Sequence, residues 1–463
     1  MNPGILGGKG QGMTSFRRGD KQCCRPAGRN RVWMLSAPLL PALLILLSAC
    51  GHVVGVMQPV GTTVAGASKV DMLVLTTRRP SGNPATLYGG ARAQSFSLND
   101  ITISIPPDAN RKAGDVQWPS HLPPDPSREF TTLAVRPLPP TQAAGSAWLA
   151  KNLPKSRDVL VFVHGFNNRY EDAVYRFAQI MHDSHADAAP VLFTWPSGGR
   201  LYDYNYDRES TIYSRDGLEQ TLHILARDPR IHEVSILAHS MGTWLAMEAL
   251  RQMAIREGRV EPKIKNVILA SPDIDIDVFA KQWSDLGAHR PAFTVFVSRD
   301  DRALAISRLI AGNVNRLGQI NPNVEPYRSA AEKAGITFID LTDLKTTDSG
   351  MNHGKFAASP EIVKAIGTRL VAGQTLTQSE IGLGDAVSIL TAGTAKAVGT
   401  GVGLAVSAPL AVVDPNTRAN LTGQADSLAQ QVSDPTGVSN DARSTAGEEL
   451  MTDDPRQKKP AGQ

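Results

Sequence analysis

The hydrophobic positions in the middle of the chain follow two alternating patterns. Short continuous apolar runs, such as V-L-V-F-V at 159–163, are typical of strands that are buried on both faces. Between such runs, apolar residues recur with the spacing of a helix, as they do at Val174, Phe177, Ala178 and Met181. Buried strands that alternate with amphipathic helices indicate a mostly parallel sheet covered on both faces. We therefore predict an α/β fold for this region.

One apolar run ends in a tight turn around a serine. The sequence V-S-I-L-A-H-S-M-G occupies 234–242, and a helical pattern, T-W-L-A-M-E-A-L, follows directly. A serine hydroxyl is a weak nucleophile unless a base lies beside it and the substrate can reach it. A sharp strand-to-helix turn lifts Ser240 out of the sheet, and Ala238 and Gly242 are small enough for such a strained turn. An ordinary surface serine between a strand and a helix would give the same motif. The presence of an acid and a base elsewhere in the chain therefore decides whether Ser240 is a nucleophile.

A second glycine-containing loop follows the buried run that starts at Asp158. It reads H-G-F-N-N from His164 onward. Around a nucleophilic serine of this kind, the loop supplies one backbone N–H to the oxyanion, and the residue after the serine supplies the other. We therefore predict an oxyanion hole of Phe166 and Met241, with Asn167 as the alternative donor in the loop. We interpret His164 as a structural histidine that fixes the loop.

The acid and the base are expected to follow the serine along the chain. A strand-like run, A-F-T-V-F-V-S, leads into R-D-D-R-A-L, which contains Asp300 and Asp301. A later loop holds His353, whereas the other histidine beyond the serine, His289, precedes a strand and would lie at the wrong end of the sheet. We predict His353 as the base and Asp301 as the acid, with Asp300 as an alternative. The competing interpretations are a helix cap for the aspartates and an exposed loop position for the histidine.

A third place for the acid is the D-I-D-I-D segment, which contains Asp273 and Asp275. We rank it lower and interpret it as a loop that caps the next helix. In the preferred arrangement, His353 takes the proton of Ser240, and Asp301 holds the histidine in the required tautomer. The two backbone N–H groups then bind the oxyanion.

Several segments together resemble a branch of bacterial α/β-hydrolases, many of them secreted or lipid-anchored and of undefined function. They are V-L-V-F-V-H-G-F-N-N, L-F-T-W-P-S, L-A-H-S-M-G-T, A-S-P-D-I-D-I-D-V-F, S-R-D-D-R-A-L, M-L-V-L-T-T-R-R-P and I-T-I-S-I-P-P. The resemblance extends from about Val70 to Leu370. It implies the α/β-hydrolase fold, the roles of Ser240, Asp301 and His353, and an esterase-like activity, without implying a particular substrate.

The N-terminal part of the chain has the pattern of a secretory leader. Basic residues cluster over 17–31, an apolar stretch occupies 32–46, and L-S-A-C ends at Cys50. This arrangement resembles a bacterial lipoprotein signal with lipid on Cys50, and Gly51 after it points to the outer membrane of the cell envelope. An uncleaved membrane helix is the alternative, and Met13 is an alternative start.

Composition narrows the chemistry. The 463-residue chain carries a net charge of +4, and no basic stripe indicates a nucleic-acid partner. All three cysteines lie at or before position 50, so a mature protein would keep only the lipidated one. No Cys/His spacing typical of a metal site occurs, and the predicted reaction needs neither a metal nor an organic cofactor.

The expected organisation is one catalytic domain with extensions at both ends. Two loops are candidates for shaping its pocket: P-S-G-G-R-L-Y-D-Y-N-Y-D at 196–207, in which Tyr202, Tyr204 and Tyr206 alternate, and Gly312–Ser329. The proline-rich stretch Pro107–Pro140 is expected to be irregular. The predicted parts are a lipoprotein signal peptide at 1–50, a tether at 51–68, the hydrolase domain at 69–372 with a β-rich and irregular beginning at 69–140, an Ala/Gly-rich apolar segment at 373–413, and a disordered polar tail at 414–463.

The function predicted from these features is a membrane-anchored serine hydrolase that cleaves a small acyl ester or thioester. An amidase or peptidase would use the same three side chains. The rival of a different class is a non-catalytic lipoprotein with an α/β-hydrolase fold that serves in binding or envelope assembly, because a fold alone does not define an activity.

Overall fold

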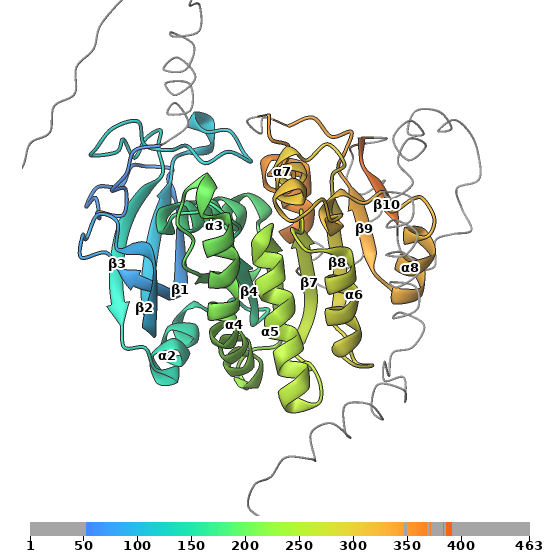
Figure 1. Ribbon diagram of the computed structural model, residues 1–463. Helices are drawn as coiled ribbons and strands as arrows, with labels where there is room; N and C mark the ends of the chain where they lie inside the picture. The colour runs from blue at the N-terminus through green and yellow to red at the C-terminus, as the bar shows by residue number, and fades with distance from the viewer. Residues whose placement is uncertain (1–51, 347–349, 368–370, 372–382, 384–385, 391–463) are drawn as a thin grey trace, which may run out of the picture. The chain divides into compact units, whose positions relative to one another are not determined.

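A ten-stranded sheet forms the centre of the computed structural model, whose described residues are 52–346, 350–367, 371, 383 and 386–390 (Figure 1). The predicted signal peptide at 1–50, the polar tail at 414–463 and most of the apolar segment at 373–413 lie outside these residues. Within them, no helix combines the length and the apolar character that a membrane crossing requires.

The strands of the sheet lie in the order β10-β9-β8-β7-β6-β4-β5-β1-β2-β3. Their bounds are β1 (Ser68–Pro80), β2 (Tyr88–Ile105), β3 (Thr131–Leu138), β4 (Asp158–Val163), β5 (Ala188–Thr194), β6 (Val234–His239), β7 (Ile264–Ala270), β8 (Ala292–Val297), β9 (Thr337–Asp340) and β10 (Ser388–Leu390). All pairings from β1 through β5, β4, β6, β7 and β8 to β9 are parallel. The pairs β1–β2, β2–β3 and β9–β10 are antiparallel. The predicted mostly parallel sheet with antiparallel N-terminal strands is confirmed.

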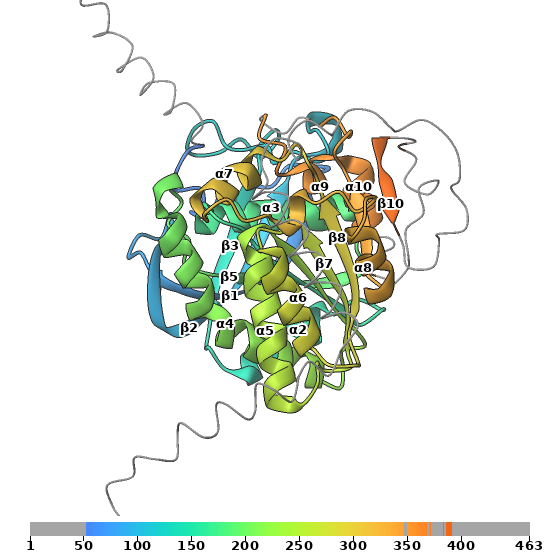
Figure 2. The same ribbon diagram turned by 45° about the vertical axis from the view of Figure 1, so that its right-hand side comes forward.

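Helices cover both faces of the sheet (Figure 2). The bounds are α2 (Gln142–Asn152), α3 (Tyr170–Ser184), α4 (Tyr204–Arg227), α5 (Met241–Glu257), α6 (Ile276–Asp285), α7 (Arg302–Ile310), α8 (Tyr327–Ala334), α9 (Lys355–Ala358) and α10 (Pro360–Ala365), with 3₁₀ turns η1 (Asp108–Asn110), η2 (Leu201–Asp203) and η3 (Leu317–Gln319). Buried residues of α2, α4, α5, α6 and α8 form the core on one face. Those of α3, α9 and α10 form the core on the other.

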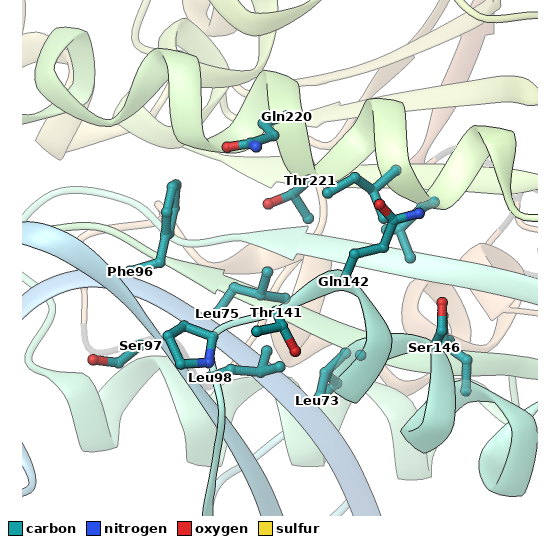
Figure 3. Close-up of a pocket in the computed structure, with 15 residues that line it drawn as sticks. Leu73, Leu75, Phe96, Ser97, Leu98, Thr141, Gln142, Ser146, Gln220 and Thr221 are labelled. Carbon is teal, nitrogen blue, oxygen red and sulfur yellow. The ribbon is translucent and has the colours of Figure 1, made fainter.

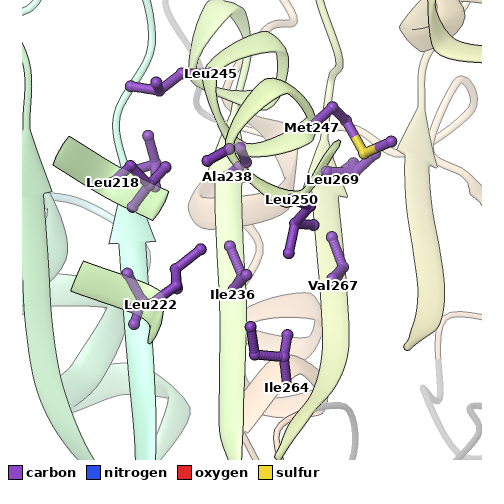
Figure 4. Close-up of a cluster of buried hydrophobic side chains, with 14 of the residues drawn as sticks. Leu218, Leu222, Ile236, Ala238, Leu245, Met247, Leu250, Ile264, Val267 and Leu269 are labelled. Atoms are coloured by element: carbon purple, nitrogen blue, oxygen red, sulfur yellow. The ribbon is translucent and has the colours of Figure 1, made fainter. Parts of the chain in front are cut away.

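Strand β4 shows why the central strands are apolar throughout. Its Val159, Val161 and Val163 belong to the core under α4 and α5, whereas Leu160 and Phe162 belong to the core under α3. Successive side chains of a strand point to opposite faces, so a strand covered on both sides needs apolar residues at every position. Figure 4 shows the first of these cores between β6, β7 and the helix α5.

The N-terminal region contains more regular structure than the sequence indicated. Strand β3 lies within the stretch Pro107–Pro140, which we expected to be irregular, and it includes Pro137. β3 is the last strand of the sheet, and a proline is tolerated at an edge because one side of the backbone needs no hydrogen bond. Strand pairing with β2 therefore prevails over the local proline content.

The segment before β1 packs against the domain. We expected a tether at 51–68, but Val56 and Met57 are fully buried in the core under α3. Nearby, the ring of His52 stacks on Trp118 at a centroid distance of 3.6 Å, and its Nε2 lies 2.7 Å from an oxygen of Asp172. The low charge of this segment thus reflects burial of part of it.

The core between α5 and the sheet generates a first prediction. Replacing Leu250, which is fully buried, by alanine should cost about 2–5 kcal/mol of unfolding free energy, because it removes apolar contacts and leaves a cavity. The matched control is Ile255→Ala on the same helix, where the side chain is 60% exposed. Thermal unfolding followed by circular dichroism checks both. Equal losses in the two variants would contradict the described packing.

Candidate active site

The backbone makes a strained turn at Ser240, between the end of β6 and the start of α5. Ser240 has φ 53° and ψ −126°, which is rare for a residue with a side chain. Backbone bonds hold this conformation: its N–H donates to Ala270 at 2.9 Å, and its carbonyl accepts from Thr243 at 3.0 Å and Asp273 at 3.3 Å. The turn therefore presents the serine at the carboxyl end of the parallel strands, where open α/β sheets place their ligands.

Two glycines permit the close packing around this turn. A Cβ at Gly242 would lie 2.2 Å from the carbonyl oxygen of His164, so the first turn of α5 sits directly on the end of β4. A Cβ at Gly165 would lie 2.7 Å from the Cβ of Ser240. The loop after β4 and the serine turn are therefore in contact, and neither glycine can carry a side chain without a shift of backbone.

Asp301 and His353 meet although they lie in different loops. The Nδ1 of His353 is 2.7 Å from Oδ2 of Asp301, whose side chain is fully buried. The other carboxylate oxygen accepts the Leu304 N–H at 2.9 Å and caps α7. The aspartate thus contacts the histidine through one oxygen and caps the helix through the other.

The loop that carries His353 lies against the end of β6. The carbonyl oxygen of His353 is 3.3 Å from Nε2 of His239 and accepts from the Ser271 hydroxyl at 3.2 Å. The rings of His239 and His353 have a centroid distance of 4.7 Å. Because His239 directly precedes Ser240, the structure brings the histidine, its aspartate and the serine turn to one edge of the sheet.

Asp300, the alternative acid, binds a lysine instead. Both of its oxygens lie 2.9 Å from Nζ of Lys355, and one accepts from Asn352 Nδ2 at 2.9 Å. Lys355 also donates to the carbonyls of Leu341 and Thr342. The ion pair connects the loop of Asp301 to the loop of His353, a role that the sequence analysis did not assign to Lys355.

The two lower-ranked acids are engaged elsewhere. Asp273 is buried and pairs with Arg316 at 3.2 Å, and it also accepts from the hydroxyls of Tyr204 (3.0 Å) and Ser307. Asp275 caps α6 by accepting two of its first N–H groups. The structure thus places neither carboxylate in a bond with His353 among the described contacts, and the cap predicted for this segment is present.

The loop Phe166–Asn168 offers one backbone N–H without an acceptor. The Asn167 N–H donates to Asp207 Oδ2 at 3.3 Å, whereas no described residue accepts the N–H of Phe166. Met241 is the first residue of α5, so its N–H has no partner within the helix. Of the two loop donors considered from the sequence, only Phe166 has its N–H available for a ligand.

His164 is a buried structural histidine. Its Nδ1 lies 2.8 Å from the carbonyl of Gly165, and the Trp195 N–H donates to its Nε2 at 3.1 Å. These contacts require the proton on Nδ1 of a neutral ring. Burial, assisted by the nearby charge of Arg78, holds the pKa of His164 well below its usual value.

The two segments considered for the pocket are buried only in part, and the first of them continues into α4, which begins at Tyr204. Tyr204 is buried and lies edge-on to Phe166 at a centroid distance of 5.3 Å, whereas Tyr202 and Tyr206 are exposed. In the segment Gly312–Ser329, Leu317 is buried and donates its N–H to the carbonyl of Ile274. The first loop therefore contributes a wall beside the oxyanion loop through Tyr204.

A cavity of about 250 Å³ lies away from these residues (Figure 3). Its walls come from β1, β2, α2 and the second half of α4, and none of the predicted site residues lines it. The apolar floor is formed by Leu73, Leu75 and Leu98.

One cluster among the described residues has the composition of a metal site. The ligand atoms of His223, Glu257 and Glu261 lie within 4.8 Å of one another. Arg227 already donates to both carboxylates, at 2.8 Å and 3.1 Å. The arginine thus supplies the positive charge there.

The sheet, the helices on both faces and the serine turn between β6 and α5 define an α/β-hydrolase fold. Comparison with known families agrees: residues 141–370, just under half of the chain, match the model of a family described as alpha/beta hydrolase of unknown function. The matched region contains the serine turn, the loop of Asp301 and the loop of His353.

The chain is also similar to a protein without a described activity. It is 35% identical over 80 residues to the uncharacterized protein alr1448 of Nostoc sp.. The similar segment covers 16% of this chain and 21% of that protein, so the chain matches about a fifth of its relative.

The buried His164 and the half-buried His239 generate a prediction about acid stability. Burial holds the pKa of His164 and of His239 well below 6.5, so in acid the unfolded chain binds protons that the folded chain does not. The folded state therefore has its full stability above the pKa of these histidines in the unfolded chain. As the pH falls below that pKa, the unfolding free energy decreases by up to about 1.4 kcal/mol per pH unit for each histidine.

Urea unfolding between pH 7 and pH 5 should therefore show a falling unfolding free energy. In His164→Gln, the unfolding free energy should depend less steeply on pH, because one of the two histidines no longer contributes. His289→Gln, at an exposed position, is the control. A slope that is the same in His164→Gln and in the parent would contradict the neutral buried ring.

Proposed function

We propose that the protein is a serine hydrolase that cleaves carboxylic esters or thioesters through an acyl-enzyme intermediate. The observation that carries the proposal is the 2.7 Å contact between His353 Nδ1 and Asp301, located beside the strained turn at Ser240. A buried carboxylate, a histidine and a serine in this chain order are the partners that make a hydroxyl nucleophilic.

The first step forms a bond between Ser240 Oγ and the substrate carbonyl carbon. The carboxylate of Asp301 accepts a hydrogen bond from His353 Nδ1–H, so the neutral ring has its free electron pair on Nε2. That nitrogen takes the hydroxyl proton as the bond forms. Asp301 stabilises the resulting imidazolium without becoming protonated itself.

The oxyanion that forms on the carbonyl needs two hydrogen-bond donors. The N–H groups of Phe166 and Met241 are the candidates, because no described residue accepts the first and the helix leaves the second without a partner. Donors of this kind, fixed before the reaction, each contribute about 3–4 kcal/mol of barrier lowering in serine hydrolases.

The second half of the reaction regenerates the serine. The imidazolium of His353 gives its proton to the leaving alkoxide or thiolate, and the carbonyl re-forms as the acyl-enzyme. Water then attacks the acyl carbon with His353 as the base, and the proton returns to Ser240 as the carboxylic acid leaves. An ester or thioester needs no further protein group, since its leaving group is a better one than an amine.

Active-site labelling tests the proposal. The parent protein should react covalently with a fluorophosphonate and hydrolyse a chromogenic ester. Ser240→Ala and His353→Ala should remove both signals, and Asp301→Asn should lower kcat on the order of 10³–10⁴-fold, because the histidine loses its tautomer.

Asp300→Asn is the matched control for the acid, because this neighbour binds Lys355 rather than the histidine. It should retain activity within about tenfold of the parent. A folded parent that takes no label would favour the alternative of a non-catalytic binding module. A greater loss in Asp300→Asn than in Asp301→Asn would assign the acid differently.

We also propose that lipid on Cys50 anchors the protein to a membrane of the bacterial envelope. The L-S-A-C sequence after an apolar stretch supports this proposal. Cys50→Ser should move the protein from the membrane fraction to the soluble fraction, as followed by immunoblotting of fractionated cells. Ser240→Ala, which leaves the leader unchanged, should stay with the membranes, and retention of Cys50→Ser there would argue against the anchor.

A further inference from the structure

Two buried charged side chains lie around the oxyanion loop and have no part in the proposed reaction. Arg78 belongs to β1, and Asp207 belongs to the first turn of α4. Their exposed fractions are 1% and 0%. Burial of a charge is costly unless hydrogen bonds compensate it, so the partners of these two groups indicate what they do.

The guanidinium of Arg78 binds neutral acceptors. Its Nε donates to the Thr194 hydroxyl at 2.8 Å, Nη1 donates to the carbonyl of Ser197 at 2.9 Å, and Nη2 donates to the carbonyl of Asn168 at 2.8 Å. Burial lowers the pKa of Arg78 to about 10, and Asp207 is the first of the negative charges that oppose this shift. The side chain thus keeps its charge at neutral pH.

Asp207 binds backbone N–H groups of the same two loops. Its Oδ2 accepts from Asn167 N at 3.3 Å and from the hydroxyl of Ser197, and its Oδ1 accepts from Gly198 N at 2.8 Å. Burial raises the pKa of this carboxyl, while the hydrogen bonds from Ser197, Gly198 and Asn167 oppose the rise. The buried carboxylate thus uses its hydrogen-bonding capacity on these two loops.

The two ions divide the backbone of the loops between them. The cation takes the carbonyls of Asn168 and Ser197, whereas the anion takes the N–H groups of Asn167 and Gly198. A further bond, from Asn168 Nδ2 to the carbonyl of Phe166 at 2.8 Å, completes the set. The peptide group between Phe166 and Asn167 is therefore held at its oxygen and at its nitrogen.

This fixation determines where the preceding peptide group points. The carbonyl of Gly165 faces His164 Nδ1 at 2.8 Å and Asn168 Nδ2 at 3.4 Å. Because a trans peptide directs its N–H opposite to its carbonyl, the Phe166 N–H points away from His164. Gly165 also lies against the Cβ of Ser240, so this N–H leaves the loop next to the serine.

We propose that Arg78 and Asp207 are positioning residues that hold the Phe166 N–H in place for the oxyanion. This inference rests on the proposed serine hydrolase. Neither side chain touches the reacting atoms, so both act through the loop. Both charged side chains hydrogen-bond to backbone groups of two loops, which follow the neighbouring strands β4 and β5.

The test compares an ester with its thionoester, in which sulfur replaces the carbonyl oxygen. Sulfur accepts hydrogen bonds weakly, so a well-placed N–H accelerates the oxoester more than the thionoester. Asp207→Asn should lower kcat for the oxoester by about 10–100-fold, a part of what loss of a whole donor costs, while KM changes little. The oxoester to thionoester rate ratio should fall by a similar factor.

Asp216→Asn is the matched control, because Asp216 lies on the same helix and its side chain is 59% exposed. It should keep the parent's ratio. Asn168→Ala, which removes the bond to the Phe166 carbonyl, is the second variant in case Asp207→Asn does not fold, and its ratio should fall as well. Measurements use the full-length protein in detergent, with active sites counted by fluorophosphonate.

The outcomes separate the two proposals. An active parent whose Asp207→Asn and Asn168→Ala variants keep the parent's rate ratio would overturn the positioning role alone, because partial unfolding lowers both rates equally. A folded parent that neither takes the label nor hydrolyses esters would overturn the proposed function and this inference with it. A fall in the ratio, with KM preserved, supports the positioning role.

Discussion

Close packing of the first turn of α5 on the end of β4 is the constraint on which the site depends. A side chain at Gly242 would collide with the carbonyl of His164, and the chain reverses sharply at Ser240 to bring the helix this close. The positive φ of the serine is the local cost of that reversal, on the order of 1–3 kcal/mol, and the surrounding backbone bonds offset it. The same packing brings the loop after β4 into contact with the serine.

Around this point, hydrogen-bonded pairs of side chains connect loops that follow different strands. Asp301 and His353 join the loops after β8 and β9, and Asp300 with Lys355 joins the same two loops a second time. In a parallel sheet these loops emerge at one edge, and side-chain contacts between them add to the bonds that each loop makes with its own strand and with neighbouring loops. Paired side chains therefore set the distances between loops that the strand ladder does not control.

The sequence allowed the fold class and the residues of local motifs to be predicted. The serine turn and the apolar strands are patterns of a few neighbouring residues. The acid and the base were predicted from their order along the chain. Arg78 could not be found in this way, because its acceptor Ser197 is 119 residues away and the contact requires the folded sheet. Lys355 was missed for the same reason, since its partner Asp300 is 55 residues away. The contacts of Asp207 with Ser197 and Gly198 span only 10 and 9 residues, but they depend on how the loop before α4 folds. Strand β3 was missed because pairing with β2 overrides its proline.

The β3 border of the sheet has a consequence for contacts between copies of the chain. In this edge strand, Pro137 lacks the N–H that a further strand would need. A strand added there from a second molecule would find an interrupted row of donors. Growth of the sheet into an intermolecular ribbon is therefore disfavoured at this border.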